Sequence, residues 1–316
     1  MNIINTQIFN DNYYQKTVKS AISFNGVGIH TGKAVNMTLL PADDNFGIVF
    51  KRIDLNKNNY IKATPQNIDN SKFCSRLKNK HGIYVSTVEH LLATLHGFEI
   101  NNVLIEINSP ELPAMDGSSY EFTQKLVDVG LKIQKTPNNI LKIRKKISIQ
   151  DGKRSIKVFP SNHLSFSIKI DYSNNFIGKD EYIYNHNMQN FINEICYART
   201  FCISNDVVKL RASGFGLGGN LNNAIVVEDN NVLNDDGLRC SNEFVKHKIL
   251  DCIGDLYMAG MPILGSVYAT QPGHELNNRL LKKIFQNKSN YEIININSHH
   301  TPISHHENII NNINVA

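Results

Sequence analysis

The order of apolar and polar residues predicts a mixed α and β structure for the first half of the chain. Residues 86–97 (STVEHLLATLHG) carry apolar side chains at helical spacing, with Ser86 or Thr87 placed to cap the start and Gly97 placed at the end. A second helix is predicted over 119–129. Period-two alternation predicts strands over 16–24 and 34–40, and further strands are predicted over 46–53 and 102–107.

The second half repeats this mixture of elements. Helical spacing is found over 242–260 and 275–286, after a Pro-Asn-Asn turn signal near residue 136. Strands are predicted over 141–149, 154–159, 164–172 and 263–270. We therefore expect an α+β fold of two similar domains, each a small β-sheet layered with about two helices. The expected division is 1–136, 137–286 and a loosely ordered polar tail over 287–316.

Length and composition narrow the class of protein. The chain has 316 residues, enough for about two domains, and its 41% hydrophobic and 19% charged residues are ordinary for a globular protein. The formal net charge of +5 suits an anionic ligand or a membrane surface but is too small to indicate nucleic-acid binding. We expect no nucleic-acid partner.

The five cysteines indicate a reducing compartment. They are odd in number and scattered, at positions 74, 196, 202, 240 and 252, without a C-x-x-C pair. The N-terminus lacks the basic and apolar regions of a signal peptide, and we find no uninterrupted apolar stretch of about 18 residues. The expected location is the cytoplasm.

One predicted helix carries a possible half of a metal site. His247, Asp251 and Asp255 lie four residues apart in turn, so they share one face of the helix over 242–260. Imidazole nitrogen and carboxylate oxygen are both zinc ligands. The alternative is a solvated face whose carboxylates pair with lysines such as Lys246 and Lys248.

The other conspicuous pair is Glu89-His90. His90 could supply a third metal ligand from the other domain, and Glu89 could act as general base for a metal-activated water. The segment is not H-E-x-x-H, because Thr94 stands four residues after His90. An exposed Glu89 beside an interior histidine is the alternative. His274, in a Pro-Gly loop before a helix, is a candidate general acid, although a loop histidine commonly has no catalytic role.

Two glycine-rich segments resemble nucleotide motifs but do not meet their requirements. GFGLGG (214–219) fits G-x-G-x-x-G, yet a polar segment precedes it and the strand-like AIVVED follows it. GVGIHTGK (26–33) has Val27 where a phosphate loop needs its first glycine, and Ala34 follows Lys33. The histidine pairs at 299–300 and 305–306 are not expected to form a functional metal site.

Read together, seven segments resemble one enzyme family. They are GVGIHTGK, STVEHLLATLHG, MDGSS, ARTF, LGGNLNNAIV, LNDDGLRCSNEFVKHKILDCIGDLYMAG and GHELNN, in this order. Between about residues 14 and 285 the chain closely resembles the UDP-3-O-acyl-N-acetylglucosamine deacetylases, zinc-dependent amidases of lipid A synthesis. The resemblance implies a site at the domain interface that hydrolyses the N-acetyl group of this nucleotide-sugar lipid.

The resemblance also implies a role for individual residues. The implied zinc ligands are His90, His247 and Asp251. The implied acid–base groups are Glu89 as general base, His274 as general acid and Asp255 as the carboxylate that orients His274. The implied substrate groups are Lys248 for positioning and charge, Thr200 for the oxyanion, Phe201 near the sugar and acyl chain, and Cys74 close to the metal.

Further expectations concern the metal, the acyl chain and partners. The family implies one zinc ion per chain, and Fe²⁺ is an alternative occupant of the same ligands. Residues 202–216 diverge where the family forms its acyl-chain passage. We expect a monomer with at most peripheral membrane contact. Two other functions stay open: a family-like protein that only binds nucleotide sugar or lipid, and a zinc amidase for another acylated amino sugar.

Overall fold

The computed structural model describes residues 14–295, and these form an α+β fold, which confirms the predicted class. The main sheet of the first half has the order β2-β3-β9-β4-β5. Its strands are β2 (Ile22–Val27), β3 (Ala34–Pro41), β4 (Ile48–Arg52), β5 (Tyr60–Lys62) and β9 (Val103–Ile107). Buried residues alternate with more exposed ones along β3 and β9, so one face of this sheet packs on the core.

Two smaller sheets complete the first half. β1 (Tyr14–Val18) pairs with β10 (Leu131–Pro137), and a three-stranded sheet has the order β6-β7-β8. The strands of this second sheet are β6 (Ile68–Asp69), β7 (Arg76–Lys78) and β8 (Tyr84–Ser86). The pairing of Arg76 with Ser86 brings the start of β7 beside the residues that lead into the first long helix.

A seven-stranded sheet dominates the second half, with the order β12-β13-β19-β11-β20 and with β14 and β15 added beside β19. Its strands are β11 (Asn139–Ile143), β12 (Ile147–Asp151), β13 (Arg154–Phe159), β14 (Leu164–Asp171), β15 (Lys179–Asn185), β19 (Ile263–Thr270) and β20 (Tyr291–Asn295). A separate small sheet contains β16 (Phe201–Ile203), β17 (Ile225–Glu228) and β18 (Asn231–Val232).

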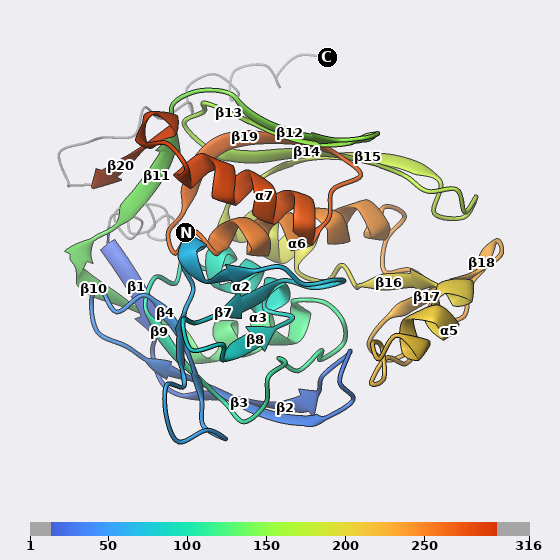
Figure 1. Cartoon of the computed structure of the whole chain (residues 1–316), viewed down its shortest axis with the longest axis horizontal. Helices are drawn as coiled ribbons and strands as arrows, with labels where there is room; N and C mark the ends of the chain where they lie inside the picture. Colours follow the sequence, from blue (N-terminus) through green and yellow to red (C-terminus); the bar gives the residue numbers. More distant parts are fainter. Residues whose placement is uncertain (1–13, 296–316) are drawn as a thin grey trace, which may run out of the picture.

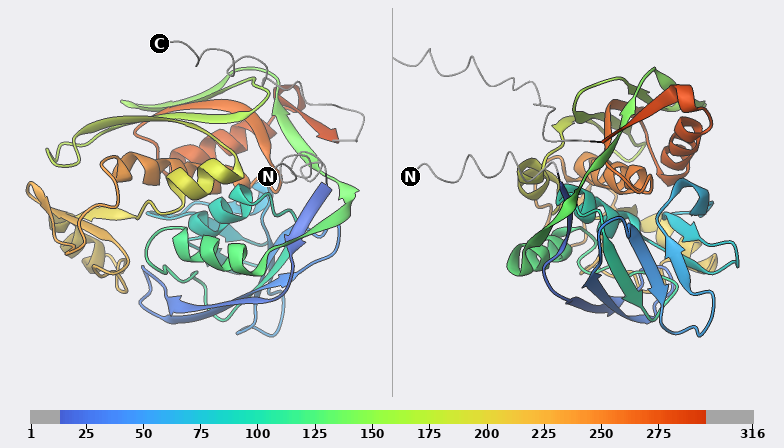
Figure 2. Two further views of the ribbon diagram at one scale, coloured as in Figure 1. Left: turned by 180° about the vertical axis from the view of Figure 1, so that it is seen from behind. Right: turned by 90° about the vertical axis from the view of Figure 1, so that its left-hand side faces the viewer.

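The long helices lie between the two main sheets (Figure 1). They are α2 (Glu89–Gly97), α3 (Tyr120–Val129), α6 (Glu243–Tyr257) and α7 (His274–Phe285). A further helix, α5 (Ser204–Ala212), lies with β16–β18 at one end of the molecule, as both face-on views show (Figures 1 and 2). Short turns of helix are α4 (Met188–Asn190), η1 (Pro65–Asn67), η2 (Phe191–Ile195) and η3 (Lys288–Asn290).

The close packing of α2 on α6 requires glycine at one position. A Cβ atom at Gly254 of α6 would lie 1.9 Å from the carbonyl oxygen of Glu89, the first residue of α2. No side chain fits in that space, so glycine lets the two helix backbones touch here. This contact places the start of α2 against the C-terminal part of α6, and both helices carry candidate site residues.

Several predicted boundaries are wrong, for reasons of hydrogen bonding and backbone geometry. The strand predicted over 16–24 is divided between β1 and β2, and that over 141–149 between β11 and β12, because each part pairs with a different partner strand. Helix α2 has no side-chain cap, and Thr87 instead adopts a left-handed backbone with φ of 57°. The tail predicted from 287 onward is ordered at its beginning, since Tyr291–Asn295 forms β20 beside β11.

The chain passes between the two groups of sheets around Asn138, between β10 and β11. The division into domains near residue 136 stays a proposal. Within 14–295, no helix is long and apolar enough to cross a membrane. The expectations for the N-terminal segment and for the histidine pairs at 299–300 and 305–306 concern residues that lie wholly or largely outside the described range.

Candidate metal centre and acid–base site

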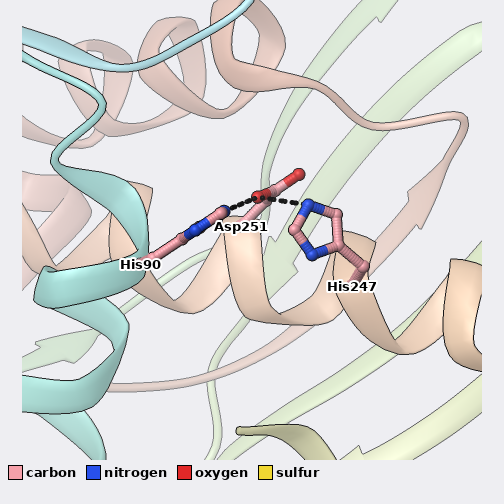
Figure 3. A group of neighbouring side chains, drawn as sticks. All are labelled: His90, His247 and Asp251. Atoms are coloured by element: carbon pink, nitrogen blue, oxygen red, sulfur yellow. Dashed lines mark ion pairs between the residues drawn. The ribbon is translucent and has the colours of Figure 1, made fainter. Parts of the chain in front are cut away.

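Three of the predicted ligands meet at the contact between α2 and α6. His90 comes from the first turn of α2, whereas His247 and Asp251 lie one turn apart on α6, and both rings point toward the carboxylate (Figure 3). The Oδ1 atom of Asp251 lies 3.6 Å from His90 Nε2 and 3.3 Å from His247 Nε2. One ligand atom from each residue can be chosen so that all three lie within 4.8 Å of one another.

The hydrogen bonds around this cluster leave the right atoms free for a metal ion. Asp251 Oδ2 accepts a hydrogen bond of 2.9 Å from Lys248 Nζ, but its buried Oδ1 has no hydrogen-bond partner. The carbonyl oxygen of Ala198 lies 3.0 Å from His247 Nδ1, which can donate to it and so keep Nε2 as the free nitrogen. Two imidazoles and one carboxylate with open coordination positions fit a catalytic divalent metal.

The electrostatics keep His247 and Asp251 deprotonated at neutral pH. Burial lowers the pKa of His247 to about 3. For Asp251, burial opposes ionisation, but His247 and Lys248 outweigh that effect and hold its pKa well below the usual range. A neutral imidazole and an ionised carboxylate are the forms that bind a metal ion.

Beside the metal cluster, His274 lies between two carboxylates. Its Nδ1 atom is 3.0 Å from Asp255 Oδ2, and its Nε2 atom is 3.6 Å from Glu89 Oε1. Asp255 is fully buried, and Asn277 Nδ2 donates a hydrogen bond of 2.8 Å to it. Glu89 on α2, Asp255 on α6 and His274 on α7 therefore form one chain of proton donors and acceptors.

The same geometry shifts the pKa values of His274 and Glu89 upward. Burial opposes the charged form of His274, but Asp255, Glu89 and Asp251 outweigh it and raise its pKa to about 10. Burial raises the pKa of Glu89, and the nearby His274 and His90 limit that rise. A protonated imidazole beside a carboxylate suits general acid and general base chemistry.

A cavity of about 890 Å³ opens from this cluster. Thr200, Phe201 and Lys248 line it, as do Glu89 and His274. The Phe201 ring contacts Lys248, whose Nζ lies 5.3 Å from the ring centre. Burial opposes the positive charge on Lys248, but Asp251 outweighs it and raises the lysine pKa. The cavity thus joins a charged end to an aromatic wall.

One wall of the cavity comes from α5 and its neighbours and carries apolar side chains beside polar ones. Residues 202–216 contain the whole of α5 and the residues that follow it. The apolar residues that line this part include Val207, Val208, Leu210, Leu221 and Leu233. These apolar side chains suit contact with a hydrocarbon chain.

Comparison with known proteins shows the family to which this chain belongs. The family model described as "LpxC: UDP-3-O-acyl N-acetylglycosamine deacetylase" matches residues 15–286. The chain belongs to this deacetylase family. The UDP-3-O-acyl-N-acetylglucosamine deacetylase of Haemophilus influenzae (strain PittEE) is 41% identical over 282 residues, which are 89% of this chain and 92% of that protein.

Other deacetylases of the family show a similar degree of identity. The one from Pasteurella multocida is 41% identical over 282 residues, covering 89% of this chain and 92% of its own length. The one from Vibrio parahaemolyticus is 39% identical over 280 residues, which are 88% of this chain and 92% of that protein. Membership of a deacetylase family makes this chain a hydrolytic enzyme, and its His-His-Asp cluster is a possible metal site.

One predicted residue of the candidate site does not line the cavity. Cys74 is buried next to Ser71, whose Oγ is 3.3 Å from its Sγ, and it is not among the described residues that line the cavity. Burial, and then the negative Glu89, raises the pKa of this thiol to about 11, so it is protonated at neutral pH.

Other residues of the candidate site were not predicted from the sequence. Asn277 holds Asp255, and the Ala198 carbonyl holds His247, but neither residue has a chemistry that stands out in a sequence. Glu111 is also buried, and it accepts hydrogen bonds from the backbone N–H groups of His30 and Thr31, both at 2.8 Å. His30 lines the cavity, and its position within GVGIHTGK is the one signal that could have indicated it.

Proposed function

We propose that this protein hydrolyses the N-acetyl group of UDP-3-O-acyl-N-acetylglucosamine and releases acetate and UDP-3-O-acyl-glucosamine. The observation that carries the proposal is the juxtaposition of the metal cluster with Glu89, His274 and Asp255 beside a cavity that also has apolar side chains from α5 and its neighbours. The names of the relatives supply the substrate. Such a cavity can hold a polar sugar and a fatty chain together.

His90, His247 and Asp251 would hold one Zn²⁺ per chain, and Fe²⁺ is the alternative occupant. When bound, zinc polarises water and a carbonyl group, and it lowers the pKa of water toward about 7. The positive charge of His274 favours the ionised form of Glu89, which is the form that can accept a proton. Its Oε1 atom, which faces His274, takes the proton of the attacking water.

His274 completes the reaction as general acid. An amine is a poor leaving group until it gains a proton, and the raised pKa of His274 keeps its ring protonated near neutral pH. Asp255 binds Nδ1, so the proton on Nε2 faces the reaction centre. His274 Nε2 donates that proton to the nitrogen as the bond from nitrogen to the acetyl carbon breaks.

The remaining predicted residues would act on the substrate. The Thr200 hydroxyl would donate a hydrogen bond to the developing oxyanion. Lys248 would balance negative charge and position the substrate, while Phe201 would contact the sugar and the start of the acyl chain. Cys74 would act close to Glu89 and not directly on the substrate, since its side chain is not among the residues that line the cavity.

We also propose the cellular setting. Deacetylation would be an early committed step of lipid A synthesis in the cytoplasm, with at most peripheral membrane contact and a monomeric enzyme. The five unpaired cysteines of the structure are what a reducing compartment would give. Analytical ultracentrifugation would test the monomer, which a stable dimer at micromolar concentration would contradict.

The direct test is acetate release from UDP-3-O-acyl-N-acetylglucosamine by the purified protein. Release should stop after chelation and return with Zn²⁺. UDP-N-acetylglucosamine without the acyl chain is the matched control, and we expect it to be a much poorer substrate because it leaves the apolar wall unused. Absence of release from folded, zinc-loaded protein would refute the proposal and favour a binding role or another acylated amino sugar.

A further inference from the structure

We propose that Ser75 is a positioning residue that sets the orientation of both carboxylates on either side of His274. This inference rests on the proposed function, because it assigns Glu89 and Asp255 their acid–base roles. Ser75 is fully buried and is not among the described residues that line the cavity, so it would act through these two side chains and not on the substrate.

The sheet β6-β7-β8 places Ser75 at this point. Ser75 directly precedes β7, whose first residue, Arg76, pairs with Ser86 at the end of β8. The backbone N–H of Val88 points to the carbonyl oxygen of Ser75 at 3.5 Å, just before α2 begins. Strand pairing therefore brings Ser75, which is far from α6 and α7 in the sequence, next to Glu89 and Asp255.

Ser75 donates one hydrogen bond to each carboxylate. Its backbone N–H donates to Glu89 Oε2 at 3.0 Å, and its hydroxyl donates to Asp255 Oδ1 at 2.5 Å. Both bonds are buried, and hydrogen bonds to charged groups in such surroundings are stronger than those between neutral groups. A single residue thus joins the general base to the carboxylate that orients the general acid.

The consequence is a choice of oxygen atom on each carboxylate. With Oε2 bound to Ser75, Glu89 presents Oε1 toward His274 Nε2. With Oδ1 bound to Ser75, Asp255 uses Oδ2 for its shorter contact with His274 Nδ1, 3.0 Å against 3.3 Å from Oδ1. The hydroxyl also engages part of the negative charge of Asp255, the charge that attracts the protonated ring of His274.

The test begins with Ser75→Ala, which removes the hydroxyl but keeps the backbone N–H. We expect kcat to fall about 10- to 100-fold with KM and zinc content near those of the wild type. Ser109→Ala is the matched control, since Ser109 is also a buried serine but lies outside the acid–base chain. In Ser75→Cys the side chain keeps about the same volume, but its thiol is only a weak hydrogen-bond donor, so this variant should behave like Ser75→Ala. Full activity of Ser75→Cys would show a packing role and overturn the proposal.

A second measurement needs no substrate. Titration of the His274 ring by nitrogen NMR in zinc-loaded protein should give a higher pKa in Ser75→Ala than in the wild type, by about half a unit, because Asp255 loses a donor. An unchanged His274 titration would refute the role of Ser75 even if the substrate proposed above is wrong. Failure of acetate release by the wild type would refute that substrate alone.

A double-mutant cycle with Asp255→Asn separates direct from indirect action. If Ser75 acts through Asp255, adding Ser75→Ala to Asp255→Asn should cost less than threefold further in kcat, because the interaction is already lost. Additive losses in the cycle would mean that the Ser75 hydroxyl acts by another route, which would contradict the proposal.

Discussion

Glu89 and His90 are neighbours in the chain but serve different parts of the site. Successive residues of a helix point in directions about 100° apart, so His90 faces Asp251 while Glu89 faces Ser75 and His274. The cluster of His90, His247 and Asp251 supplies metal donors, whereas Glu89 has no part in it. Substitutions of these residues should therefore separate metal loss from loss of proton transfer.

We expect Asp251→Ala to lose the metal and Glu89→Gln to keep it. Removal of Asp251 deletes the one ligand oxygen that is buried without a hydrogen-bond partner, whereas Gln at 89 preserves shape and leaves all three ligands. Zinc content measured after dialysis should fall far below one per chain in Asp251→Ala. It should stay near one in Glu89→Gln, with kcat lowered by about 10²–10⁴. Full zinc retention by Asp251→Ala would contradict its role as a ligand.

We expect the basic limb of the pH profile to report the titration of His274. Its pKa is raised to about 10 because Asp255, Glu89 and Asp251 together outweigh burial, so the acid is protonated below that pH and activity is lost as pH rises through it. Asp255→Asn removes the largest raising influence, and the basic limb of kcat/KM should move to lower pH by about 2 units. A basic limb that stays in place in Asp255→Asn would show that another group titrates there.

At the scale of elements, the two glycine-rich segments, 26–33 and 214–219, form a contact of their own. Leu217 N–H donates to the carbonyl oxygen of His30 and Gly218 N–H donates to that of Ile29, both at 3.1 Å. A Cβ atom at Gly218 would lie 2.3 Å from the carbonyl oxygen of Gly28. The glycines serve close backbone approach, and this contact closes one side of the cavity, which Ile29 and Gly219 line.

Gly218→Ala should separate the two glycine-rich segments and weaken binding of the acyl chain. The added methyl group meets backbone that cannot move aside as a flexible side chain can. We expect KM for the acylated substrate to rise about tenfold with a smaller change in kcat. Gly219→Ala is the control in the same loop, since its nearest atom would be 3.3 Å away, and it should have a smaller effect. Equal KM values for the two variants would contradict this account.

At the scale of the whole molecule, the two halves also meet in a stack of three rings, away from the residues that line the cavity. His96 of α2 lies between His186, which follows β15, and Tyr257 of α6, with ring centres 4.4 Å apart on each side. Burial lowers the pKa of His186 to about 4 and lowers that of His96 well below its usual value. Both rings are therefore neutral in the folded protein near neutral pH.

This stack should make the fold sensitive to acid. Histidine in an unfolded chain has a pKa near 6.5. Between about pH 6.5 and 4 the unfolded chain therefore binds protons that the folded chain does not, and the free energy of unfolding decreases as the pH is lowered. His186→Phe keeps a stacked ring and removes one titrating group. Thermal unfolding followed from pH 7 to pH 4.5 should show a shallower loss of Tm in the variant. An identical pH dependence in both proteins would refute this assignment.

Much of the fold follows from local patterns. The helices α3 and α6 and the strands β9 and β19 lie close to where periodicity places them, because each has one face or stripe buried in the core. The three-stranded sheet β6-β7-β8 and the strand β20 were not predicted. Their strands are short, and they are stabilised by pairing with distant partners such as β11. Residue order alone does not contain that information.

The sequence by itself determined the residue types of the site and the helices that carry them. His247, Asp251 and Asp255 share a face of α6 because their spacing matches the turn of a helix. Only the tertiary structure decided that His90 meets them, that Asp251 keeps one oxygen free, and that Ser75 joins Glu89 to Asp255. The physical reason is that these contacts depend on the approach of α2 to α6 at Gly254 and on strand pairing, which are set by packing across the whole chain.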